Sequence, residues 1–238
     1  MRVADLSPWV LGGGAAALGL AAGLASARLA DLLPARYGIT HLTAGAKRSR
    51  RNAAVVALTA ASALALALVA SREPEASASS AAIWLVTNVL CAGALLAASA
   101  IDLEHMILPN EITIGGAILC LATAHFRRVG IVGGLVGAAV GLAVAYVPFL
   151  VYKRLRGHSG MGLGDAKLLV LVGAWHGFEG ALFVLFAGAV QSVLCAAVMR
   201  LVGVTYPVPE SVAAELRELR AQADAGDEEA KELLADDP

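Results

Sequence analysis

Two aspartates, Asp102 and Asp165, stand at the ends of apolar segments. An ionisable side chain is costly to insert there, so its presence needs a reason. Asp102 is followed closely by Pro109, which cannot donate a backbone hydrogen bond and disfavours helix at the residue before it. Asn110 is then placed to cap a new helix that begins at Glu111. The sequence therefore predicts a helix end, a turn and a helix start beside an acid.

Asp165 lies in the glycine-rich stretch Gly160-Met161-Gly162-Leu163-Gly164-Asp165-Ala166-Lys167, which leads into another apolar segment. Because glycine has no side chain, an extended peptide can approach the acid closely at Gly162 and Gly164. A phosphate-binding loop is the competing interpretation, but Gly-Lys-Ser/Thr is absent and an acid at a helix start would repel phosphate. Lys167 fits two roles, namely partial neutralisation of the carboxylates or anchoring of the helix end at the membrane interface.

The chemistry of two acids that meet is that of a carboxylate pair. Such a pair does not ionise twice readily, so one acid keeps a proton at neutral pH while the other is a base. The base can take a proton from water as it attacks a peptide carbonyl, and the neutral acid can protonate the carbonyl oxygen and then the leaving nitrogen. Asp102 and Asp165 are therefore candidate catalytic residues. Glu104 and His105 are too few for a metal site and are expected to be solvated loop residues.

The elements that must position these acids are membrane helices. The 238 residues are 58% hydrophobic and 16% charged, with a mean hydropathy of +0.73, which excludes an ordinary soluble enzyme. About 20 apolar residues cross a bilayer. Seven apolar segments are found, of which the fourth and sixth are short: 9–30, 53–70, 81–101, 111–126, 130–152, 167–178 and 180–202. The predicted fold is all-α, a polytopic transmembrane bundle of about seven spans with an acidic C-terminal tail.

The predicted spans group into three regions. Residues 1–80 form an accessory helix pair with a basic loop, and residues 81–206 form the core with both acids. Residues 207–238 form the acidic tail, which is partly helical or disordered. Within the core, the Gly-x-x-x-Gly stripe from Gly133 to Gly141 predicts close packing within the bundle or between copies. Trp175 and its neighbours are expected to anchor a helix at the outer interface.

Loop charges set the expected orientation, because lysines and arginines in short loops stay on the cytoplasmic side. The basic residues gather in the loops after the first and fifth spans: Arg28, Arg36, Lys47, Arg48, Arg50, Arg51, Lys153, Arg154, Arg156 and Lys167. This pattern places both acids at the cytoplasmic ends of their helices, at similar depth, where they can meet. The side of the tail stays open, because it depends on whether the sixth segment crosses the membrane or only dips into it.

The two motifs together resemble the type IV prepilin peptidases, which are intramembrane aspartyl proteases of the GxGD type. The resemblance rests on Asp102 before Leu108-Pro109-Asn110 and on the later Gly162-Leu163-Gly164-Asp165-Ala166-Lys167-Leu168, and it covers residues 83–202. It implies that Asp102 and Asp165 are the catalytic aspartates. The supporting residues around the substrate would be Pro109, Asn110, Gly162, Gly164 and Lys167.

The resemblance also implies a reaction and a place for it. The reaction is removal of a basic leader peptide from type IV prepilins, or from the pseudopilins of type II secretion, at the cytoplasmic face of the bacterial inner membrane. The expected partners are that substrate and membrane lipid, with no nucleic acid. Presenilin-like proteases share Gly-x-Gly-Asp, but they carry a Tyr-Asp pair and a later Pro-Ala-Leu, whereas residue 101 is Ile and no Pro-Ala-Leu follows Asp165.

Two alternatives stay open. Large family members join the peptidase to an N-methyltransferase and often carry two Cys-x-x-Cys pairs in the first cytoplasmic loop, but this loop has no cysteine. The chain therefore resembles a short form that needs no cofactor or metal for proteolysis, and S-adenosylmethionine only if methylation is retained. The second alternative is an ion- or proton-coupled transporter that uses Asp102 and Asp165 as intramembrane acids.

Overall fold

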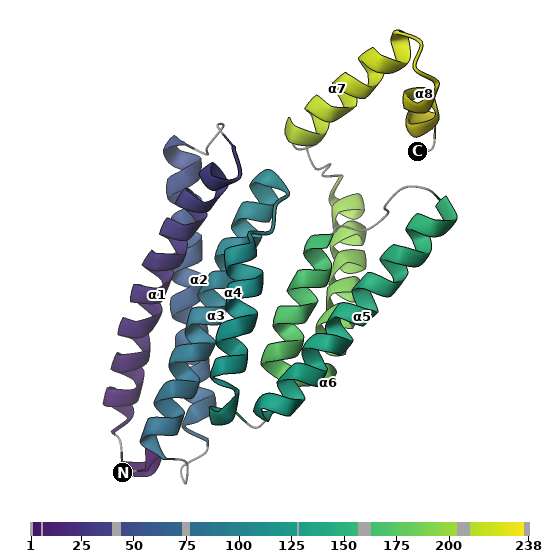
Figure 1. The fold of residues 1–238 in the computed structure, drawn as a ribbon. Helices are drawn as coiled ribbons and strands as arrows, with labels where there is room; N and C mark the ends of the chain where they lie inside the picture. Colours follow the sequence, from purple (N-terminus) through teal and green to yellow (C-terminus); the bar gives the residue numbers. More distant parts are fainter. Residues whose placement is uncertain are drawn as a thin grey trace. The chain divides into compact units, whose positions relative to one another are not determined.

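A computed structural model describes residues 2–5, 7–39, 44–72, 77–127, 129–156, 163–203 and 210–235 (Figure 1). Within this part of the chain the secondary structure is helical, apart from one isolated β-bridge between Arg2 and Ser77. Five helices are long and apolar enough to cross a membrane. They are α1 (Pro8–Arg36), α2 (Gly45–Ala70), α3 (Ala78–His105), α5 (Gly130–Arg156) and α6 (Leu163–Val202). The predicted all-α, multi-pass membrane protein is confirmed.

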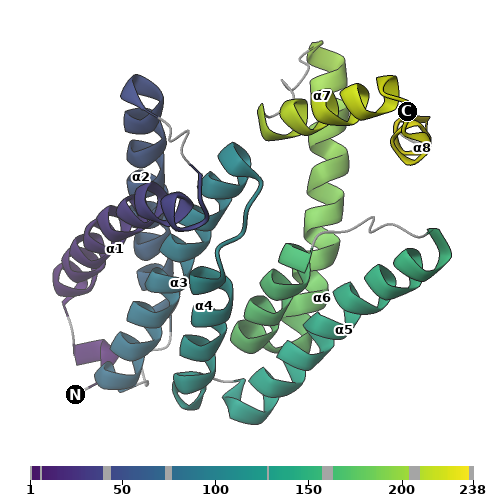
Figure 2. The same ribbon diagram turned by 45° about the horizontal axis from the view of Figure 1, so that its top comes forward.

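The chain divides into two compact units, Met1–Gln191 and Ser192–Pro238. In the first unit the helices run alternately in opposite directions, with the shorter α4 (Asn110–Ala122) between α3 and α5 (Figures 1 and 2). The end of α3 and the start of α4 therefore lie at one end of this unit. The second unit holds the end of α6 together with α7 (Glu210–Asp224) and α8 (Glu228–Ala235).

The predicted sixth and seventh segments both lie in α6, which is interrupted at Gly177. This residue has φ 78° and ψ −175°, a backbone conformation that is essentially restricted to glycine. Within the first unit, residues 178–191 run back beside the first arm of the helix, which is residues 163–176 (Figures 1 and 2). The first arm is thus short, as the sequence predicts. The chain reverses its direction at Gly177, without a separate loop between the two arms.

Local sequence explains where the helices that carry the acids begin and end. At the start of α3, the Ser77 side chain accepts a hydrogen bond from the Ser80 backbone N–H, as an N-cap should. The last turn of α3 ends at Met106, which has φ 55° and is the one non-glycine residue with positive φ in the described part of the chain. Pro109 then precedes the first turn of α4, where its missing N–H costs nothing.

Helices α5 and α6 are in backbone contact, as the glycine stripe predicts. A Cβ atom at Gly137 would lie 2.2 Å from the carbonyl oxygen of Gly173, and one at Gly173 would lie 2.1 Å from the carbonyl oxygen of Gly137. At Gly141 a Cβ atom would lie 2.3 Å from the carbonyl oxygen of Leu169. Small residues permit this approach in membrane helices, so the stripe packs within the chain.

Helices α3 and α4 are in contact through two buried thiols. The Sγ atoms of Cys91 and Cys120 lie 3.5 Å apart, and both residues are buried, whereas Cys195 is exposed. Rotation of these side chains can bring the sulfurs to the disulfide distance of about 2.05 Å. Cys91 and Cys120 are thus small core residues of the first unit.

We expect a membrane-permeant oxidant such as iodine to link Cys91 to Cys120 in native membranes. Mass spectrometry of the peptides measures the linkage, and a Cys195→Ala variant keeps the third thiol out of the reaction. Cys195 should react with a lipid-soluble maleimide before denaturation, while the other two thiols should react only after it. Efficient linkage of Cys195 to either buried thiol would contradict the packing of α3 on α4.

Candidate active site

The two predicted catalytic acids lie at the ends of different helices. Asp102 is in the last turn of α3 and Asp165 is in the first turn of α6, and both side chains are exposed. A Cβ atom at Gly164 would lie 3.1 Å from the Cδ1 atom of Leu108, so the start of α6 packs on the segment that follows α3. The fold therefore brings the turn that carries Asp165 beside the segment that follows the turn of Asp102.

The start of α4 ties three helices together beside these acids. The Lys167 ammonium donates a hydrogen bond to Asn110 Oδ1 (2.8 Å), which links α6 to α4. The Tyr37 hydroxyl, just after α1, accepts a hydrogen bond from the Asn110 backbone N–H (2.9 Å) and donates one to Glu111 Oε2 (2.8 Å). Pro109 is buried at this junction, and Gly162 lies outside the described residues.

The expected capping role of Asn110 is wrong. Helix α4 begins at Asn110 itself, Pro109 occupies the N-cap position, and no side chain caps the first turn. The physical reason is that the Asn110 side chain is engaged by Lys167 and its backbone N–H by Tyr37. For Tyr37, the hydrogen bond from Asn110 lowers the pKa, but burial, the hydrogen bond to Glu111 and the Glu111 charge together raise it above its usual value.

A buried ionic cluster, consisting of Asp31, Arg48, Arg51 and Glu104, lies where α1, α2 and α3 meet. Arg51 donates to Glu104 Oε2 (2.7 Å) and is also paired with Asp31, and the side chains of these three residues are only 9–14% exposed. Arg48, which is more exposed, pairs with Asp31 at 2.7 Å. The expectation that Glu104 and His105 are solvated loop residues is therefore wrong. Both belong to α3, and their side chains are 9% exposed.

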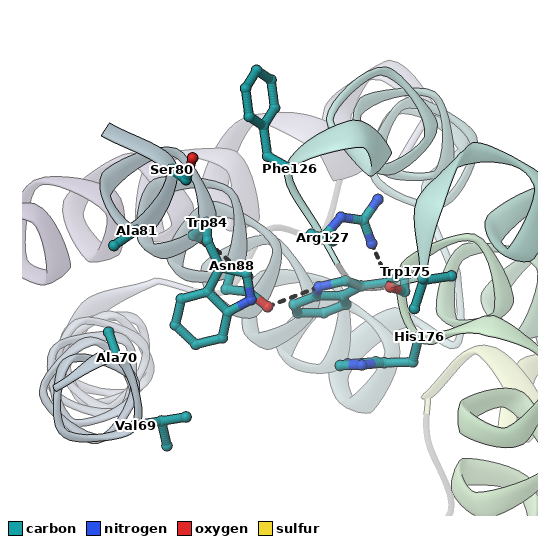
Figure 3. A pocket seen from close by; sticks show the side chains of 11 residues that line it. Val69, Ala70, Ser80, Ala81, Trp84, Asn88, Phe126, Arg127, Trp175 and His176 are labelled. Carbon is teal, nitrogen blue, oxygen red and sulfur yellow. Dashed lines mark hydrogen bonds between the residues drawn. The ribbon is translucent and has the colours of Figure 1, made fainter. Parts of the chain in front are cut away.

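A cavity of about 370 Å³ lies at the opposite end of the first unit, between the start of α3 and the end of the first arm of α6 (Figure 3). Trp175 lines it and is buried, and its Nε1–H donates to Asn88 Oδ1 (2.8 Å). The expectation that Trp175 anchors the protein at the interface is thus wrong, because its indole faces α3. Trp84, which precedes Asp102 by 18 residues on α3, and His176, which follows Asp165 by 11 residues on α6, also line the cavity.

Arg127 caps the C-terminal ends of two helices beside this cavity. Its guanidinium donates to the backbone carbonyls of Cys120, at the end of α4, and of Ala174 and Trp175, at the end of the first arm of α6. Carbonyls at helix ends lack partners within the helix and carry partial negative charge. Burial lowers the pKa of Arg127, which still stays protonated. Arg127 therefore has a structural explanation, and the acids lie at the other end of the bundle.

Sequence reasoning singled out the two acids but did not single out Arg51, Asp31 and Tyr37, which the structure places near them. One signal was available, since Asp31, Arg51 and Glu104 carry opposite charges at the ends of predicted spans on the same side of the membrane. Opposite charges at one end of a bundle are candidates for pairing. Their pairing was not predicted because hydropathy does not show which way each helix is rotated about its axis.

Comparison with known proteins points to one family. A sequence model of the type IV leader peptidase family matches residues 89–198, which include both acids. A prepilin leader peptidase/N-methyltransferase of Xanthomonas campestris pv. campestris is 36% identical over 112 residues, which are 42% of this chain and 36% of the relative. A protein of the same name from Pseudomonas aeruginosa is 35% identical over 109 residues, which are 45% of this chain and 38% of the relative.

A third relative of that name, from Pseudomonas putida, is 38% identical over 86 residues, which are 36% of this chain and 30% of the relative. The chain thus spans about a third of the length of the curated relatives that it matches. No solved structure matches it significantly. The family match and the paired motifs agree, so residues 89–198 of the chain are similar to the type IV leader peptidase family.

Proposed function

We propose that this protein is a membrane-embedded aspartyl endopeptidase that removes the basic leader peptide from type IV prepilins or pseudopilins. The observation that carries the proposal is the family match over residues 89–198, a segment that contains both Asp102 and Asp165. The relatives are named prepilin leader peptidase/N-methyltransferase, which supports this substrate class. The bacterial inner membrane is the proposed location, with the acids at its cytoplasmic face, because the basic loops lie at that end.

The proposed mechanism needs only these two acids and water. One carboxylate removes a proton from water as the water oxygen attacks the scissile carbonyl carbon, while the other acid donates its proton to the carbonyl oxygen. When the tetrahedral intermediate collapses, the carbon–nitrogen bond breaks, the first acid gives the proton that it took from water to the leaving nitrogen, and the second acid recovers its proton from the former carbonyl oxygen. Exposure of both side chains gives water a route to them. No cofactor takes part in these proposed steps.

The neighbours of the acids have proposed roles in holding the site. Lys167 and Asn110 form the hydrogen bond that ties α6 to α4 beside Asp165. Gly164 has no side chain, which allows Leu108 to pack closely against the start of α6 beside Asp165. Pro109 fixes the turn between α3 and α4. With Gly162, these residues would position the substrate strand rather than react with it.

A deletion host tests the proposal. The chain is expressed with a prepilin, or with a pseudopilin, in a bacterium whose own prepilin peptidase has been deleted, and the mass of the product is measured. We expect loss of the leader from at least one substrate, and the same mass reports any methyl group that is added. Full-length substrates in the presence of normal membrane levels of the chain would contradict the proposed activity.

A further inference from the structure

The buried ionic cluster connects helices outside the family match to the helix that carries Asp102. Arg51, on α2, donates to Glu104 Oε2 on α3 at 2.7 Å and pairs with Asp31 on α1. Asp31 also accepts hydrogen bonds from Arg48 and from Asn52 Nδ2 (3.1 Å). Arg51 is thus the one residue of the cluster that contacts both of the other helices through its own guanidinium.

The burial of this cluster makes its geometry specific. The side chains of Arg51 and Glu104 are 10% and 9% exposed, so water cannot replace either partner easily. Charged groups that lie away from water require paired, well-directed hydrogen bonds. The planar guanidinium provides several donors in a fixed fork, which lysine does not. Arg51 can therefore hold the Glu104 carboxylate in one position relative to α1 and α2.

Helix geometry passes this constraint to Asp102. Asp102 and Glu104 are two residues apart on α3, so their side chains leave the helix roughly 200° apart around its axis. When Glu104 is fixed against α2, Asp102 is directed to the other side of α3. This is also the last turn of α3, which ends at the positive-φ residue Met106 and has no following turn to hold it.

We propose that Arg51 is a positioning residue of the peptidase: it binds Glu104 from α2 and thereby sets the rotation of the helix end that presents Asp102 to Asp165. Asp31 holds Arg51 in place from α1. The inference rests on the proposed function. It assigns to the first two helices the task of orienting one catalytic acid.

Kinetics with a prepilin substrate test the positioning role. We expect Arg51→Met to lower kcat by about 10- to 100-fold, since small misplacements of reacting groups have effects of that size, while KM changes by less than about twofold. Arg51→Lys should recover part of kcat because it retains the charge. Arg36→Met is the matched control, because Arg36 is an arginine at the same end of the bundle whose one ion pair within the described residues is a long, exposed contact to Glu111 (3.8 Å). Unchanged kcat in Arg51→Met, or an equal loss in the control, would overturn the proposal.

A second readout does not depend on activity. Cysteines at positions 102 and 165 are cross-linked with a short bifunctional thiol reagent in native membranes, with and without Arg51→Met. We expect the yield to fall several-fold when Arg51 is replaced, and an unchanged yield would overturn the positioning role. Glu104→Gln, which keeps the side-chain volume, replaces Arg51→Met if that variant does not accumulate. The two proposals can fail separately. If Arg51→Met lowers the cross-linking yield but the chain with both aspartates does not cleave a prepilin, Arg51 still sets the position of residue 102, and only the proposed peptidase function is refuted.

Discussion

Asp102→Asn and Asp165→Asn are each expected to reduce prepilin cleavage by about two to four orders of magnitude or more, the size of a general acid–base contribution. The carboxamide keeps the size of the side chain but can neither take a proton from water nor deliver one to the leaving nitrogen. Both acids should be required, because each proposed step moves a proton at each of them. The measurement is the cleavage rate in membranes, normalised to the amount of each variant.

A matched control separates loss of chemistry from loss of charge. Glu179→Gln removes an exposed carboxylate from α6 just after Gly177, at the end of the bundle opposite the acids. Its cleavage rate should equal that of the unmodified chain. If either aspartate variant cleaves at the normal rate, that residue is not a catalytic acid and the pair does not act as a dyad.

Gly173→Ala is expected to destabilise the protein by about 1–3 kcal/mol, in the range of over-packed cores. The added Cβ atom would lie 2.1 Å from the carbonyl oxygen of Gly137, so α5 and α6 must separate. Because Asp165 is carried by the same arm of α6, cleavage should fall as well. Thermal unfolding in detergent measures the stability, and the cleavage assay measures the activity.

The control for this prediction is Gly188→Ala, which lies on the same helix and has no atom within 4 Å of the added Cβ. Alanine is the better helix former, by about 1 kcal/mol in helix interiors, so this substitution should be neutral or slightly stabilising. The two alanine substitutions should therefore have different signs. Equal effects on the unfolding temperature would show that backbone contact between α5 and α6 does not hold this unit together.

The positions of the helices could be predicted from the sequence, because the length of an apolar run is set by the thickness of a bilayer. The turn at Pro109 and the backbone contact along the stripe from Gly133 to Gly141 could also be predicted, since both depend on local properties of proline and glycine. The reversal at Gly177 was placed only approximately, because nothing in the sequence distinguishes that glycine from Gly180 nearby.

Contacts between helices were much harder to predict. Trp175 is of a residue type that often anchors helices at the membrane interface, but its indole donates a hydrogen bond to Asn88 inside the bundle. Glu104 lies between Asp102 and Pro109, in a polar stretch that is typical of a loop. In the structure it belongs to a helix and accepts a hydrogen bond from Arg51 of another helix. In both cases the outcome depends on the rotation of a helix about its axis and on its neighbours, which a pattern of hydropathy does not contain.

Asp102 and Asp165 are proposed to form one site, and cross-linking of these two positions tests that pairing. Cysteines replace both aspartates in a chain whose Cys91, Cys120 and Cys195 are alanine, and a short bifunctional thiol reagent is added to native membranes. We predict a cross-link between positions 102 and 165, and none in a control that pairs 102 with a cysteine at position 179. Two thiols that both react with a monofunctional reagent but never become linked would contradict the account.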